Sequence, residues 1–171
     1  MPLVSEEIYI YIYFGIFALL LIKEKTWRGL LITIGALGLV LVSDYLCARV
    51  LKPYFGRLRP YYTVSGIYAY RHGKYIFLKE PLPKKERYSF PSCHATNVSC
   101  AAMVLTRAMP NFSPFFWSAA LVVGYSRIYL GAHYPSDVLF GFIVGSLVGF
   151  IGSSIGKLIW MFLVNFYKNR K

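Results

Sequence analysis

Residues 29–51 read GLLITIGALGLVLVSDYLCARVL, and within that stretch only Asp44 and Arg49 carry a charge. Both charged residues lie near its far end. A helix of about 20 apolar residues is long enough to cross the hydrocarbon core of a bilayer. The stretch therefore predicts a transmembrane helix.

Further apolar segments lie on both sides of this helix. The 171-residue chain is 57% hydrophobic and only 15% charged, and its mean hydropathy is +0.50. One water-soluble domain of this length could not bury so much apolar sequence. We expect a single membrane-embedded domain over residues 1–171, folded as an all-α, polytopic bundle of about five spans. The expected spans cover residues 8–22, 29–51, 92–109, 114–129 and 136–155.

The last expected span contains a row of small residues. Gly141, Gly145, Gly149 and Gly152 recur at helical spacing, which favours close packing against a neighbouring membrane helix. The apolar residues 158–167 that follow either prolong this helix or lie along the membrane interface.

The segment 61–88 differs from the rest of the chain. It mixes aromatic side chains with Lys and Arg and is too highly charged to cross a bilayer. Such a composition is typical of an interfacial loop or a short amphipathic helix at headgroup depth.

The chain has three cysteines, Cys47, Cys93 and Cys100. Their odd number and their positions in or beside apolar blocks indicate neither a disulfide pattern nor metal-ligand spacing. The compartment in which the chain works is therefore not indicated by its cysteines.

Charges in the short loops predict an orientation in the membrane. With five spans, Lys23, Arg107 and the basic carboxyl terminus fall on the same side, which the positive-inside rule makes cytoplasmic. We expect a multi-pass inner (cytoplasmic) membrane protein whose amino terminus and polar site face the periplasm or exterior. The net charge of +12 indicates an anionic membrane surface or substrate and not nucleic acid, because the basic residues punctuate apolar spans.

Three polar clusters fall on the expected outer side, at residues 52–60, 89–97 and 126–137. Each cluster alone could be a polar cap on a membrane helix. Together they supply cations, a helix amino terminus and two histidines, which are groups that phosphoryl transfer requires. His133 and Asp137 are four residues apart, so one helical turn would let the carboxylate orient the imidazole.

The three clusters also carry a recognisable signature. Lys52 through Arg59-Pro60 fits K-x6-R-P, residues 91–94 resemble P-S-G-H, and residues 126–137 fit S-R-x5-H-x3-D. The chain thus resembles the type 2 phosphatidic acid phosphatase (PAP2) superfamily over roughly residues 44–140, and a three-part signature is far more specific than one motif.

The resemblance implies roles for individual residues. His133 would attack phosphorus, Asp137 would orient it, and His94 would protonate the leaving oxygen and later activate water. The chemistry would need no metal and no cofactor. The residues implied in phosphate binding are Lys52, Arg59, Ser92, Cys93 and Arg127.

Several residues stand outside the family pattern. Cys93 replaces the motif glycine and would keep its backbone N–H, while its thiol could be reactive. We interpret Arg57, Lys84 and Lys85 as candidate contacts to a lipid headgroup.

The resemblance implies a lipid phosphatase acting at the outer leaflet on a phospholipid or lipid A. The basic, aromatic outer segment suits a large anionic headgroup, and resemblance to bacterial lipid A 1-phosphatases implies removal of the 1-phosphate of lipid A. Undecaprenyl pyrophosphate phosphatase and phosphatidylglycerophosphatase are the alternatives within this class. An anion channel or carrier is the alternative of another class, but a conduit would require polar residues along the spans, and here they cluster at one end.

Overall fold

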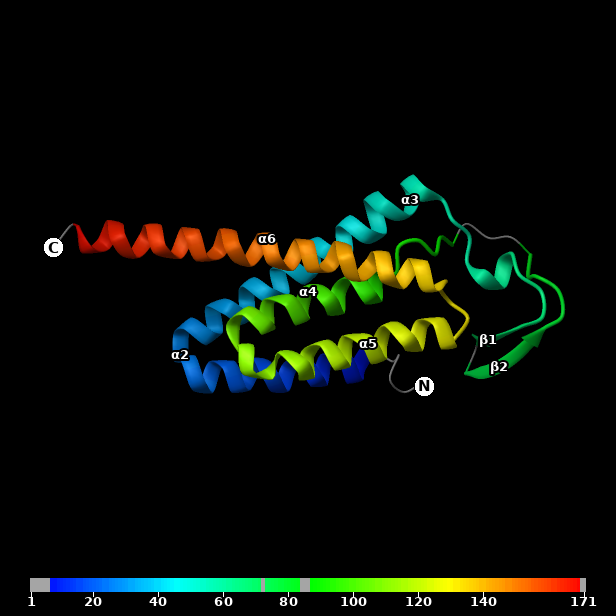
Figure 1. Cartoon of the computed structure of the whole chain (residues 1–171), viewed down its shortest axis with the longest axis horizontal. Helices are drawn as coiled ribbons and strands as arrows, with labels where there is room; N and C mark the ends of the chain where they lie inside the picture. Colours follow the sequence, from blue (N-terminus) through cyan, green and yellow to red (C-terminus); the bar gives the residue numbers. More distant parts are fainter. Residues whose placement is uncertain (1–6, 72, 84–86, 170–171) are drawn as a thin grey trace.

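The computed structural model describes residues 7–71, 73–83 and 87–169. Helices dominate the described chain, and one two-stranded sheet accompanies them (Figure 1). In chain order the elements are α2 (Glu7–Tyr45), the π-helical turn η1 (Leu46–Leu51), α3 (Lys52–Phe55), the 3-10 turn η2 (Pro60–Tyr62), β1 (Ile67–Arg71), β2 (Lys74–Leu78), α4 (Cys93–Ala108), the 3-10 turn η3 (Pro110–Phe112), α5 (Ser113–Tyr129) and α6 (Pro135–Lys168).

Helix α2 folds back on itself and forms two arms (Figure 1). At the bend, Gly29 packs so closely on Leu21 that an added Cβ would overlap the Leu21 carbonyl oxygen. The two arms correspond to the expected spans 8–22 and 29–51. The second arm continues through η1 into α3, which ends at Gly56 in the left-handed conformation, with φ 59°.

The five-span count is not confirmed. Among the described residues, two helical stretches are long and apolar enough to cross a membrane, Trp27–Phe55 and Pro135–Lys168. Helices α4 and α5 have 16 and 17 residues, at or below the lower limit for a straight span. The count of about five therefore stays a prediction, and the structure supports a helical fold with long apolar helices.

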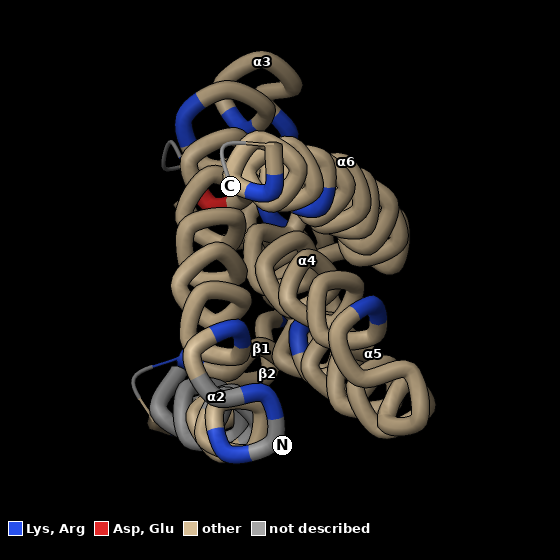
Figure 2. The backbone as a smooth tube through the Cα atoms, turned by 90° about the vertical axis from the view of Figure 1, so that its left-hand side faces the viewer, with Lys and Arg blue, Asp and Glu red and all other residues tan. Residues whose placement is uncertain are grey.

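Helix α4 lies at the centre and contacts α2, α5 and α6. Its apolar face joins buried side chains from the bend of α2 and from α5, including Leu21, Val98, Phe116 and Ala120. At the carboxyl end of α4, the Lys25 ammonium, from the bend of α2, donates to the Ala108 carbonyl oxygen at 2.5 Å, a favourable place for a cation beside a helix carboxyl terminus. Viewed along the long axis, Lys and Arg clearly outnumber Asp and Glu (Figure 2).

The predicted glycine packing is confirmed. Helix α6 lies against α4, and a Cβ added to Gly145 would overlap the Thr96 carbonyl oxygen. A Cβ added to Gly141 would lie 2.8 Å from the carbonyl oxygen of Ser92, the cap of α4, and one added to Gly149 would lie 2.7 Å from that of Cys100. A Cβ added to Gly152 would overlap the Leu39 side chain of α2. Only residues without a side chain permit this approach, so these glycines fix how α6 sits on α4.

Residues 158–167 prolong the last helix. Helix α6 runs without interruption to Lys168, and its carboxyl-terminal part projects beyond the other helices (Figure 1). Its apolar side chains there are exposed in the isolated chain, among them Leu158, Phe162 and Tyr167.

The expectation of an interfacial loop or short amphipathic helix over 61–88 was wrong for the middle of the segment, where β1 and β2 form a β-hairpin. Strands β1 and β2 pair antiparallel with Ala69 opposite Ile76. The physical reason is visible in the alternation of residues 67–71, which turns Ala69 inward and Tyr68 outward, and in Gly73, whose φ of 80° suits the turn. The fold is therefore helical with one hairpin and not purely all-α.

The hairpin docks on the turn between α5 and α6. The Tyr70 amide donates to the Leu130 carbonyl oxygen at 3.1 Å, and the rings of Tyr75 and Tyr129 lie 5.9 Å apart. Gly131 has a φ of 66°, and a Cβ there would come within 2.5 Å of the Tyr68 carbonyl oxygen. The hairpin thus supports the turn that carries His133.

Candidate active site

The three polar clusters meet at the hairpin end of the bundle. Lys52 begins α3, Ser92 caps α4, and His133 lies in the turn between α5 and α6. Lys52 interacts electrostatically with Arg59 and Asp137. His94 interacts electrostatically with Arg127 and His133. Lys52 and Asp137, 85 positions apart in the sequence, are therefore part of one site.

His133 and Asp137 form the buried centre of this site. The Asp137 side chain has no exposed surface, and its Oδ2 lies 3.6 Å from His133 Nδ1. That distance is longer than a hydrogen bond, and Nδ1 has no hydrogen-bond partner among the described residues. Oδ2 instead accepts the Tyr134 backbone N–H at 2.8 Å. Since catalytic hydrogen bonds are often long without substrate, the arrangement suits a carboxylate that orients an imidazole.

The charge state of His133 follows from its surroundings. Burial lowers the pKa of its imidazole to about 4, and the positive charges of Arg59 and Lys52 act in the same direction. Asp137 opposes them by favouring the imidazolium. His133 is therefore neutral at physiological pH, which is the form that can act as a nucleophile.

This pKa can be measured directly, because His72, His94 and His133 are the only histidines in the chain. In a His72→Gln/His94→Gln protein, NMR titration of the remaining imidazole should show a pKa near 4. Its ring should be neutral above that pH and protonated below it. A pKa near the ordinary value of about 6.5 would mean that the ring is solvated and not held among cations.

Groups suited to binding an anion surround the two histidines. Arg59 Nε and Ser92 Oγ are buried and lack hydrogen-bond partners among the described residues. Such atoms are costly unless a ligand or water satisfies them, and a phosphate oxygen would do so. The Ser92 backbone N–H does not face a phosphate, because it donates to the Asp137 carbonyl oxygen at 3.0 Å. Within the described ranges, no three His, Cys, Asp or Glu side chains cluster in a way that could hold a metal ion.

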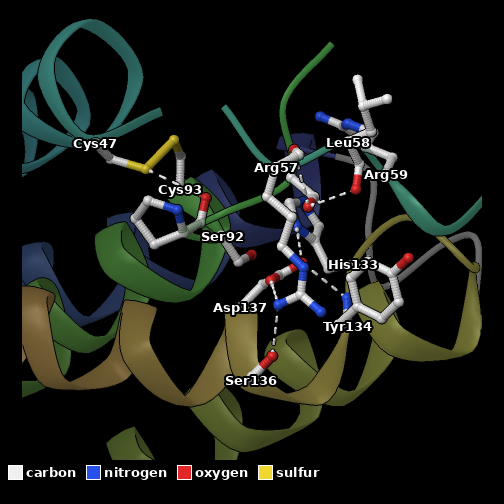
Figure 3. A network of polar contacts seen from close by, with 12 residues as sticks. Cys47, Arg57, Leu58, Arg59, Ser92, Cys93, His133, Tyr134, Ser136 and Asp137 are labelled. Atoms are coloured by element: carbon white, nitrogen blue, oxygen red, sulfur yellow. Dashed lines mark hydrogen bonds and ion pairs between the residues drawn. A yellow bond between two sulfur atoms is a disulfide. The ribbon is translucent and has the colours of Figure 1, made fainter. Parts of the chain in front are cut away.

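Arg57, expected as a candidate headgroup contact, makes a contact within the site that the sequence did not suggest. Its Nη1 donates to Asp137 Oδ1 at 2.9 Å and to Ser136 Oγ at 2.8 Å, and its guanidinium lies 3.9 Å from the centre of the Tyr134 ring. Figure 3 shows this network around Asp137. Sequence reasoning missed the contact because nothing local connects residues 57 and 137. The other two candidate headgroup contacts, Lys84 and Lys85, lie outside the described residues.

The expectation for the cysteines was wrong. Cys47 and Cys93 form a disulfide with Cα atoms 5.5 Å apart (Figure 3), and Cys100 is the free, buried third. The pair is separated by 46 residues and becomes adjacent only where η1 meets the start of α4. Cys93 is therefore not a reactive thiol, and its bridge ties the helix that leads to Lys52 to the helix that carries His94.

Comparison with known proteins finds relatives that are named as phosphatases. The chain is 34% identical to a lipid A 4'-phosphatase of Porphyromonas gingivalis, in an alignment covering 78% of this chain and 55% of that protein. It is 33% identical to an undecaprenyl-diphosphatase of Sulfolobus acidocaldarius, over 85% of this chain and 64% of that protein. The chain thus spans somewhat more than half the length of these curated relatives.

A solved structure shares the fold. The crystal structure of a transmembrane PAP2-type phosphatidylglycerolphosphate phosphatase from Bacillus subtilis superposes with a TM-score of 0.57 at 25% identity, covering 91% of this chain and 72% of that one. The family model described as PAP2 superfamily matches residues 33–169, which include all three polar clusters. The chain therefore belongs to the PAP2 superfamily.

Proposed function

We propose that the protein is a membrane lipid phosphatase that works through a phosphohistidine intermediate on His133, without a metal ion. The observation that carries the proposal is the buried, neutral His133 beside Asp137, among the cations of Lys52 and Arg59. Membership of a superfamily whose relatives are named as phosphatases supports the same conclusion.

In the proposed first step, His133 Nε2 attacks phosphorus and the bond between phosphorus and the leaving lipid oxygen breaks. His94, which holds an added proton while the anionic phosphate is bound beside it, gives that proton to the leaving oxygen. In the second step His94 takes a proton from water, whose oxygen attacks phosphorus and releases inorganic phosphate from His133. Cations and the Ser92 hydroxyl stabilise the charge on the phosphoryl oxygens. The phosphate-binding group in this proposal comprises Lys52, Arg59, Ser92, the Cys93 backbone and Arg127.

The proposed substrate is an anionic lipid with a large phosphorylated headgroup, in the first place lipid A at its 1-phosphate. The hairpin beside the site supports this choice, because it combines Arg71, Lys74 and Lys79 with exposed aromatic rings such as Tyr68 and Phe77. Undecaprenyl pyrophosphate and phosphatidylglycerol phosphate are the alternatives, since similar proteins are named for them. The site would face the outer leaflet.

The test of the function uses the purified full chain and a panel of phosphorylated lipids. The panel contains lipid A with defined phosphates, undecaprenyl pyrophosphate, phosphatidylglycerol phosphate and phosphatidic acid, each with and without a chelator. Released phosphate is measured, with the His133→Ala protein as background. We expect chelator-insensitive release that is fastest from the lipid A 1-phosphate. Fastest release from another lipid would revise the substrate, and no release from any would refute the proposed function.

The contribution of the hairpin cations can be separated from the chemistry. Lys74→Gln/Lys79→Gln should raise KM for lipid A, because each basic residue near an anionic surface contributes about 1 kcal/mol. Hydrolysis of a short, soluble phosphate ester should hardly change, and high salt should mimic the variant. Lys157→Gln/Lys168→Gln, on the projecting part of α6, is the matched control. Equal losses on both substrates would show that the hairpin supports the fold and not the headgroup.

A further inference from the structure

The carboxylate of Asp137 is held from two sides. Its Oδ1 accepts from Arg57 Nη1 at 2.9 Å, and its Oδ2 accepts from the Tyr134 amide at 2.8 Å. Oδ2 is also the atom that faces His133 Nδ1. The orientation of the carboxylate toward the imidazole therefore depends on both donors, and only one of them, Arg57, is a side chain.

Arg57 is itself fixed in place. Its Nη1 also donates to Ser136 Oγ, and its guanidinium stacks on the Tyr134 ring, whose hydroxyl lies 2.6 Å from Thr63 Oγ1. Its backbone carbonyl oxygen accepts the Ser89 amide at 2.7 Å. An arginine with this many partners has little freedom to follow a mobile lipid headgroup.

Because Asp137 is buried, loss of its ion pair with Arg57 would have a large effect on the carboxylate. The Asp137 side chain is fully buried, whereas 40% of the Arg57 side chain is exposed. A buried carboxylate that loses its counter-ion must gain a proton, turn toward another cation or admit water. Without Arg57, the Asp137 carboxylate would keep only the Tyr134 amide of its two donors, so its orientation toward His133 would be less firmly fixed.

We propose that Arg57 is a positioning residue that holds the Asp137 carboxylate in the orientation that sets the tautomer of His133. The inference rests on the proposed function, because it assigns Arg57 a part in activating the same nucleophile. Arg57 occupies one of the six unspecified positions of the K-x6-R-P motif. In this proposal it orients the Asp137 carboxylate and does not bind phosphate or a headgroup.

Kinetics distinguishes positioning from headgroup binding. Arg57→Met should lower kcat by about 10- to 100-fold, as loss of a supporting hydrogen-bond partner commonly does, and by the same factor for lipid and for a soluble phosphate ester. KM should change less than about threefold, because the phosphate-binding groups are intact. Arg57→Lys should recover part of kcat. A rise in KM confined to the lipid would instead make Arg57 a headgroup contact and overturn the proposal.

A double-mutant cycle tests whether Arg57 acts through Asp137. In an Asp137→Asn background, Arg57→Met should cost less than about threefold, because the carboxylate that it positions is gone and coupled residues are not additive. Arg107→Met is the matched control, since Arg107 also stacks on an aromatic ring, Phe150, but away from the site. Additive losses would show that Arg57 acts independently of Asp137.

The His133 tautomer gives a readout that needs no turnover. In the His72→Gln/His94→Gln protein, ring ¹⁵N shifts should report a proton on Nδ1, which the facing carboxylate favours. Adding Arg57→Met, or Arg57→Lys if the first variant fails to fold, should shift the ring toward the Nε2–H form. An unchanged tautomer would refute the positioning role. Absence of phosphate release by the unmodified chain in the lipid assay would refute only the proposed function.

Discussion

Replacing His133 with alanine should lower phosphate release by at least about 10³-fold, because loss of a covalent nucleophile removes the first chemical step. No other described side chain combines burial, a facing carboxylate and surrounding cations in this way. The measurement is phosphate released per minute from lipid A and from a soluble ester, with thermal unfolding to verify that the variant folds.

Variants of Asp137 and His94 test the roles of the two residues that assist His133. Asp137→Asn should keep partial activity, because the imidazole remains but is poorly oriented. His94→Ala should slow substrates with poor leaving groups most, because those need the proton. Near-normal release by the His133→Ala protein on any lipid would exclude the covalent mechanism.

Gly145→Leu should destabilise the protein by about 1–3 kcal/mol or more, as overpacking a close contact does. Its Cβ would overlap the Thr96 carbonyl oxygen, which belongs to a helix backbone and cannot move aside like a flexible side chain. Because α6 carries Asp137 and α4 carries His94, displacement of the two helices should also lower activity. The measurement is the Tm of the purified protein together with its kcat.

The same helix provides the control for this variant. Gly156 has no atom within 4 Å of an added Cβ, so Gly156→Leu should leave Tm unchanged or slightly raised, since leucine has the higher helix propensity. Equal effects at both positions would mean that the close approach of α6 to α4 does not limit stability.

The sequence was sufficient to predict features that depend on local pattern. Helix α5 and the start of α6 lie within a residue of the expected spans, because prolines and apolar runs mark their ends. The glycines of α6 predicted its packing face. The family signature brought His94, His133 and Lys52 into one predicted site, and the structure brings these residues together.

Contacts between distant residues were not predictable in this way. The Cys47–Cys93 bridge and the Arg57–Asp137 ion pair join residues 46 and 80 positions apart, and no spacing rule applies at such separations. The hairpin is a different case, because the alternation over residues 67–71 and Gly73 were visible. Its aromatic and basic side chains equally suit an interfacial segment, and composition alone does not distinguish the two.

In the proposed mechanism, phosphate is transferred to His133 before it is released. Rapid mixing of the full chain with ³²P-labelled lipid, quenching in alkaline detergent and peptide mapping tests it most directly, because phosphohistidine survives alkali and is lost in acid. We expect acid-labile label on the peptide that contains His133 and none in the His133→Ala protein. Label on another residue, or turnover without any labelled protein when release is slowed in the His94→Ala variant, would contradict it.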